Sequence, residues 1–268
     1  MPSATLNICC LKWGTKYSSN YVNRLAAMVR RNVKRPHRFV CFTDDRADIH
    51  ESVECLPLLD QGLTGWWHKL SFFRPTLYDL SGTLLFLDLD LVILSSLEPF
   101  FDYPGEFCII RDWLASDYVR LYNSSVFRLE IGSKTDVYNK FLLTSQQIIS
   151  SCPGDQHWIT QQIPNATTWP RPWCVSFKWQ CAAPQPDNPI LPEAAKIVVF
   201  HGNPNPHEAM TGTYRIYGPK HFVPHDMRGS PASWIARYWN TEGLDPATPG
   251  LVERHTISSF YSRSSQND

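Results

Sequence analysis

The sequence predicts an α/β fold with a mainly parallel central sheet and helices on both faces. Short apolar runs typical of strands alternate with segments of helical periodicity through the first half of the chain. Several of these runs are apolar at successive positions, as expected of strands that are covered on both sides. The chain has 268 residues, of which 43% are hydrophobic and 19% charged, so it can form one large core.

The first strand is expected at residues 5–13 (TLNICCLKW), because this run is apolar and rich in β-forming residues. A helix over 19–32 follows, since its apolar residues recur at helical spacing, a serine precedes it and two arginines lie near its end. Further strands are expected at 38–45 (RFVCFTDD) and 52–58 (SVECLPL). The segment 65–77 (GWWHKLSFFRPTL) is predicted to be a helix that its proline ends or kinks.

The remaining elements follow the same two periodicities. Strands are predicted at 83–94 (TLLFLDLDLVIL), 106–113 (EFCIIRDW), 124–130 (SSVFRLE) and 196–200 (KIVVF), and helices at 134–148 (KTDVYNKFLLTSQQI) and, shorter, at 231–240 (PASWIARYWN). Residues 1–206 are expected to form the core domain. Residues 207–268 are expected to be a Pro- and aromatic-rich extension that ends in a polar, disordered tail.

Composition excludes some functions and locations. Lysines plus arginines equal aspartates plus glutamates at 25 each, so the chain lacks the net positive charge that general nucleic-acid binding requires. Its first residues do not form a secretory signal, and no run of about 18 apolar residues could span a bilayer. The eight cysteines contain no CxxC pair, so we expect reduced, structural thiols in a cytoplasmic protein.

The extension at 207–268 mixes arginine and lysine with tryptophan and tyrosine. Such a segment can touch an anionic membrane surface from the cytoplasmic side and so reach a lipid-linked acceptor. The alternative interpretation is a lid or a packing segment.

Two carboxylates interrupt the apolar run 83–94. An unpartnered buried carboxylate costs several kcal/mol, so Asp88 and Asp90 need a positive partner or an exposed face. Residues two apart on a strand point to the same side, and two hard oxygen ligands there suit Mg²⁺ or Mn²⁺. An exposed edge strand with an acidic face is the alternative, but the flanking residues are apolar on both faces. His201, which directly follows the expected strand 196–200, is a third candidate ligand.

Four motifs give the chain a family resemblance over roughly residues 5–206. FLDLDLVI after a KL-bearing helix, then YNSSVFRLE, GDQHWI and VVFHGNPNP, occur in this order. The set resembles the retaining, metal-dependent glycosyltransferases of the GT-A fold, in the family-eight group of glycogenins and lipopolysaccharide galactosyltransferases. The resemblance implies transfer of a hexose from a nucleoside diphosphate sugar, with UDP as the expected nucleotide, to a glycan or lipid-linked acceptor.

The resemblance also implies roles for individual residues. Asp88, Asp90 and His201 would hold Mn²⁺ (or Mg²⁺) against the donor diphosphate, and Asp88 would thereby bind the donor. Around the reacting sugar carbon it implies the catalytic groups Asn123, Asp155 and Gln156. The remaining donor-binding residues that it implies are Lys12, Trp13, Gly14, Tyr17, Lys69, Asp112, Gly202 and Asn205.

One of these positions departs from the family pattern. The family usually has a lysine, aimed at the diphosphate, where this chain has Asn205 in HGNPNP. An asparagine can donate a hydrogen bond but supplies no charge. Binding of the diphosphate is therefore expected to be weaker, unless Lys12, Lys16 or Lys69 compensates.

Two other functions fit parts of the sequence. In a haloacid-dehalogenase-like phosphatase, Asp88 would be the nucleophile and Asp90 the general acid/base. That family's later acidic pair is missing here, and strands precede the motif that normally opens its domain. A non-catalytic nucleotide-sugar-binding protein is the other alternative, and Asn205 is consistent with it.

Overall fold

A computed structural model describes residues 5–116, 121–185, 187–216 and 227–244. Within them, the main sheet contains β1 (Leu6–Lys12), β2 (Arg38–Thr43), β3 (Glu54–Pro57), β4 (Thr83–Leu87), β6 (Phe107–Arg111), β7 (Tyr122–Glu130) and β8 (Thr167–Thr168). The strand order is β3-β2-β1-β4-β7-β6-β8, and β7 runs antiparallel to both of its neighbours. The other pairs are parallel. The predicted mainly parallel α/β sheet is confirmed.

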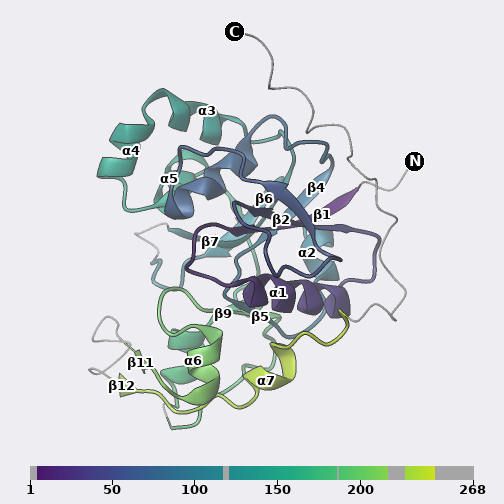
Figure 1. Ribbon diagram of the computed structural model, residues 1–268. Helices are drawn as coiled ribbons and strands as arrows, with labels where there is room; N and C mark the ends of the chain where they lie inside the picture. Colours follow the sequence, from purple (N-terminus) through teal and green to yellow (C-terminus); the bar gives the residue numbers. More distant parts are fainter. Residues whose placement is uncertain (1–4, 117–120, 186, 217–226, 245–268) are drawn as a thin grey trace.

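Helices cover both faces of this sheet (Figure 1). The helices of the described residues are α1 (Ser19–Asn32), the 3₁₀ helix η1 (Gly65–Phe73), α2 (Glu98–Asp102), α3 (Asp136–Leu143), α4 (Ser145–Ser151), α5 (Asp155–Gln162), the π-helix η2 (Phe177–Ala182), α6 (Pro206–Thr211) and α7 (Ile235–Tyr238). Of these, α6 and α7 lie beyond α1, away from the main sheet (Figure 1). The helix predicted at 65–77 ends at Phe73, before Pro75, and is 3₁₀ in type. The single helix predicted at 134–148 is wrong, because the backbone leaves the helical region at Thr144.

The central strand β1 shows why the sheet is covered on both sides. All seven of its residues are buried. Ile8 and Cys10 pack into one hydrophobic core with α1, whereas Cys9 and Leu11 pack into a second core with η1. Successive strand residues point to opposite faces, so the unbroken apolar run 8–11 requires a layer on each side.

The predicted strand 83–94 is wrong in one respect: it is two strands in two sheets. β4 ends at Leu87, and β5 (Leu91–Ile93) begins a small sheet of order β5-β10-β9 with β10 (Ile197–Val199) and β9 (Cys174–Ser176). The chain bends between them. This bend takes Asp88 and Asp90 out of the strands: Asp88 stays partly exposed, whereas Asp90 is buried and therefore loses hydration.

The described part of the extension 207–268 packs on the side of α1. Ala209, Tyr214, Ile235 and Trp239 belong to the same hydrophobic core as α1, and the guanidinium of Arg24 lies 4.2 Å from a ring centre of Trp239. A hairpin of β11 (Arg215–Ile216) and β12 (Met227–Arg228) precedes α7. The predicted tail lies outside the described residues, and the division at residue 206 stays a prediction.

Two further observations bear on the setting of the chain. All eight cysteines are free thiols. Among the described residues, no helix is both long enough and apolar enough to cross a membrane.

Candidate active site

The candidate site lies where β4 and β10 end. Asp88 follows β4 directly, and its backbone N–H donates to the carbonyl of Ser125 on β7 at 2.9 Å. Antiparallel pairing of β5 with β10 continues past the strands, because the N–H of Phe200 donates to the carbonyl of Asp90 at 3.1 Å. This register brings the backbone of His201, the residue after Phe200, close to the segment 88–90. Ligands of open α/β sheets bind at such carboxyl ends.

The charge of Asp88 is met by a lysine of the chain itself. Lys69 of η1 is buried, and its ammonium lies 2.8 Å from Oδ2 of Asp88 and 3.4 Å from Oγ of Ser124. Ser124 in turn donates to Oδ2 of Asp155 at 2.6 Å. Burial lowers the pKa of Lys69, but Asp88 and Asp155 outweigh this and hold it above its ordinary value. Lys69 therefore stays charged and joins η1, β7 and α5.

Asp90 is buried, and no lysine or arginine of the described residues forms an ion pair with it. Its Oδ2 accepts a hydrogen bond of 2.7 Å from the hydroxyl of Tyr17. Burial and the neighbouring Asp88 raise the pKa of Asp90 to about 6, although the bond from Tyr17 acts the other way. Burial, followed by the charge of Asp90, raises the pKa of Tyr17, which stays a protonated donor. We call the segment with Asp88 and Asp90, together with His201, the rim of the site. The rim thus carries an excess of negative charge at Asp90.

His201 contacts Ser176 and the rings of Trp113 and Trp179. Its Nε2 lies 2.7 Å from Oγ of Ser176, and its ring stacks on Trp113 with centres 4.8 Å apart and planes 13° apart. Burial and the nearby ammonium of Lys178 lower the pKa of His201 to about 3. The imidazole is therefore neutral, as a metal ligand must be.

These residues fit a divalent cation by their chemistry. Two carboxylates and a neutral imidazole form a donor set that suits Mn²⁺, and the raised pKa of Asp90 marks a charge that a cation would neutralise. In the structure Asp88 binds Lys69, Asp90 binds Tyr17, and His201 binds Ser176. Over the described ranges, no three such side chains are already gathered as tightly as a metal site requires.

The residues expected around the sugar lie next to this network. Asp155 is the first residue of α5 and is buried, which raises its pKa, and Gln156 follows it half-buried. Asn123 lies on β7 next to Ser124, and its Oδ1 accepts the N–H of Ser125 at 3.0 Å. The structure therefore brings Asp155 next to Lys69 through Ser124, and Asn123 lies beside Ser124 on the same strand.

The residues expected around the nucleotide gather at the ends of β1 and β2. The ammonium of Lys12 is buried and lies 3.3 Å from the carbonyl of Asp45. Gly14 has φ = 55° and donates its N–H to Oδ2 of Asp44 at 2.9 Å. The ring of Trp13 between them lies 6.3 Å from that of His68.

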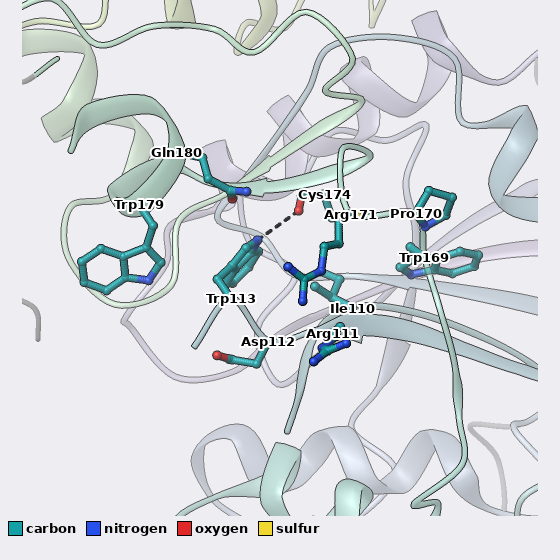
Figure 2. A pocket seen from close by; sticks show the side chains of 10 residues that line it. All are labelled: Ile110, Arg111, Asp112, Trp113, Trp169, Pro170, Arg171, Cys174, Trp179 and Gln180. Carbon is teal, nitrogen blue, oxygen red and sulfur yellow. Dashed lines mark hydrogen bonds between the residues drawn. The ribbon is translucent and has the colours of Figure 1, made fainter. Parts of the chain in front are cut away.

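A cavity of about 130 Å³ lies beyond Trp113, and neither aspartate of the rim lines it (Figure 2). Asp112, Trp113 and Trp179 contribute to its wall, and the indole N–H of Trp113 donates to the carbonyl of Cys174 at 3.1 Å. Burial raises the pKa of Asp112, whose Oδ1 accepts the N–H of Leu114. Trp113 is thus shared between this cavity and His201.

Asn205 is turned toward its own helix. It is the N-cap of α6, and its backbone N–H and Nδ2 both donate to Oε2 of Glu208, at 2.7 and 3.2 Å. Gly202 has φ = 76°, a left-handed conformation that glycine adopts without strain. The donor-binding roles of these two residues stay predictions.

Sequence reasoning missed Trp113, Ser176 and Lys178. Each touches or faces His201 through a contact between parts of the chain that are far apart in sequence. No motif marks them, and only the aromatic character of Trp113 beside Asp112 was a signal.

Comparisons with known proteins give the fold but no close relative. No family model matches the chain, and no curated protein sequence matches it. The structure is similar to that of the galactosyltransferase LgtC in complex with donor and acceptor sugar analogs, with a TM-score of 0.56 and 13% identity over 75% of this chain and 88% of that one. It is also similar to the apo-form of the glycosyltransferase GlyE of Streptococcus pneumoniae TIGR4, with a TM-score of 0.55 and 10% identity.

The second similarity covers 76% of this chain but only 56% of GlyE. At sequence identities of 10–13%, the structural similarity is evidence for the fold alone. The chain therefore has the GT-A-type α/β fold found in glycosyltransferases, as its motifs predicted.

Proposed function

We propose that this chain is a metal-dependent glycosyltransferase that moves a hexose from a nucleoside diphosphate sugar to a glycan or lipid-linked acceptor. UDP is the proposed nucleotide, and retention of configuration is the proposed outcome. One observation supports the proposal: Asp88 and Asp90 follow β4, and the backbone pairing of β5 with β10 continues through Asp90 and Phe200 to the residue before His201. A cytoplasmic location, with residues 207–268 touching a membrane, stays a prediction.

The chemistry assigns tasks to the chain's own residues. When the bond between the sugar and the diphosphate breaks, negative charge develops on the leaving phosphate. A divalent cation bound by Asp88, Asp90 and His201 would act as a Lewis acid toward that charge. Lys69 adds a fixed positive charge beside Asp88.

The acceptor hydroxyl forms the new bond to the sugar carbon and gives up its proton. Asp155, which is joined to Lys69 through Ser124, and Gln156 beside it are the groups proposed to orient the sugar. Retention requires either a protein nucleophile at that carbon or attack from the face of the leaving group.

The sequence left two alternatives, a phosphatase and a non-catalytic binding protein, and the fold argues against only the first. The two solved structures described above are glycosyltransferases, and neither supports a haloacid-dehalogenase-like phosphatase. A non-catalytic nucleotide-sugar-binding protein has the same fold and is separated from an enzyme by turnover.

Calorimetric titration with UDP tests the proposal. We expect binding at least tenfold tighter with Mn²⁺ than with a chelator, because the cation joins the carboxylates to the diphosphate. Absence of UDP binding in both conditions would refute the proposed function. Release of UDP from UDP-hexoses in the presence of acceptor extracts then separates the enzyme from the non-catalytic alternative.

His201→Ala is expected to raise the Mn²⁺ concentration needed for half-maximal UDP binding by about tenfold, because one of three protein ligands is lost. The substitution also removes the stack on Trp113. Trp113→Leu is the matched control, since it removes the stack and keeps the imidazole. An equal shift in both variants would show that His201 acts by packing and does not bind the metal.

A further inference from the structure

One cation of the candidate site is not explained by the motifs. Lys178 is the second residue of the π-helix η2. Ser176 fixes the start of this helix, since its Oγ accepts the N–H of Trp179 at 3.3 Å and its own N–H donates to Oε1 of Gln180 at 2.7 Å. The same Oγ contacts Nε2 of His201. The backbone of Lys178 is therefore fixed to the residue that holds the candidate metal ligand.

The ammonium of Lys178 reaches the rim of the site. A Cβ built on Gly202, the residue after His201, would lie 3.4 Å from Nζ of Lys178. Burial lowers the pKa of Lys178, and the negative charge of Asp90 acts against this effect. The positive charge of Lys178 contributes to the lowered pKa of His201. Nζ of Lys178 also lies 5.7 Å from the ring centre of Trp179.

This ammonium has no acceptor of its own within the described part of the chain. The two other buried lysines of the site are paired, Lys69 with Asp88 and Lys12 with Asp45. Lys178 is half-buried, and no carboxylate or carbonyl among the described residues lies within hydrogen-bond or ion-pair distance of its Nζ. A partly desolvated cation without an acceptor is unfavourable unless an anionic ligand completes it.

We propose that Lys178 binds the diphosphate of the nucleotide donor directly. The proposal rests on the proposed function. A cation at Asp88 and Asp90 would bring the diphosphate to this rim, and Nζ of Lys178 lies next to Gly202, the residue that follows the proposed ligand His201. Asn205 supplies no charge, and its backbone N–H and Nδ2 already donate to Oε2 of Glu208. Lys178, from a different element, supplies the positive charge that stabilises the departing phosphate, as charge-assisted hydrogen bonds do.

The test compares UDP with uridine on the full chain in the presence of Mn²⁺. Lys178→Met is expected to weaken UDP binding by about tenfold or more, in the range for hydrogen bonds between charged groups. Its affinity for uridine, which lacks phosphates, stays unchanged. Its affinity for Mn²⁺ alone stays the same or rises, because a positive charge near Asp90 has been removed. Lys178→Arg is expected to recover part of the UDP affinity.

Lys196→Met is the matched control, because Lys196 is also half-buried with its ammonium 5.5 Å from a tryptophan ring centre, at the opposite end of β10. If the Met variant of Lys178 does not fold, Lys178→Gln keeps a polar side chain and gives the same comparison. Unchanged UDP affinity in the Lys178 variants, or an equal loss for UDP and uridine, would overturn the role of Lys178 while wild-type binding leaves the proposed function standing. A wild-type protein that does not bind UDP would overturn both.

Discussion

Asp90→Asn is expected to abolish Mn²⁺-dependent UDP binding and hexose transfer without destabilising the metal-free protein. The amide keeps the size of the side chain and can still accept the hydroxyl of Tyr17, but it lacks the charge that a metal ligand needs here. Burial and Asp88 raise the pKa of Asp90 to about 6, so the ionised carboxylate opposes folding at neutral pH. Removing it is expected to stabilise the chain by roughly 1–3 kcal/mol.

The sign of this effect gives a pH test. The folded pKa of Asp90 lies above the unfolded value of about 3.9, so its cost is full above pH 6 and disappears as the pH falls toward 4. Melting temperatures measured with a chelator should therefore be higher for the variant than for the wild type at pH 7, and should converge near pH 4.

Asp112→Asn is the control for this prediction, because Asp112 is also a carboxylate whose pKa burial raises, but it lies by the cavity beyond Trp113. Its UDP binding should keep the full dependence on Mn²⁺. An Asp90→Asn variant with wild-type metal dependence would contradict the assignment of Asp90 as a ligand.

Local patterns of the sequence were sufficient for most of the fold. The unbroken burial of β1 and the periodic apolar face of α1 depend on neighbours within one element, and both were predicted close to their observed bounds. The continuous strand at 83–94 was wrong because its apolar residues satisfy two different sheets. Only the tertiary structure shows that β4 pairs with β1 and β5 pairs with β10.

The candidate site was predictable only where a residue type conflicts with its surroundings. Asp88 and Asp90 are charges in an apolar run, and His201 follows a buried strand, so each is visible in the sequence. Their partners are not. Tyr17 reaches Asp90 across 73 residues of sequence, and Lys178 faces the rim because Ser176 fixes a π-helix that has no signal in FKWQCA.

Lys69→Met is expected to lower the free energy of unfolding by roughly 3–5 kcal/mol, as removal of one partner from a buried ion pair does. The ammonium contacts Asp88 and Ser124, and Ser124 contacts Asp155; without it the half-buried Asp88 and the buried Asp155 lose the positive charge between them. For a chain of this length the loss corresponds to about 6–20 °C in melting temperature. Thermal unfolding monitored by circular dichroism measures it.

Lys134→Met is the matched control on the surface. Its ammonium lies 2.7 Å from Oε2 of Glu106, whose side chain is 85% exposed, so the pair should contribute less than about 1 kcal/mol. If the Lys69 and Lys134 variants had the same melting temperature, this would show that water already screens the Lys69–Asp88 ion pair.

A second substitution in the Lys69–Asp88 pair distinguishes its contribution to stability from its proposed role in donor binding. Lys69→Met combined with Asp88→Asn removes both charges of the bridge, so the double variant should recover much of the stability that the single variant loses. It should not recover UDP binding, because Asp88 is a proposed metal ligand and Lys69 a proposed donor contact. Recovery of both would mean that the Lys69–Asp88 pair stabilises the junction of η1 with β4 and takes no part in binding the donor.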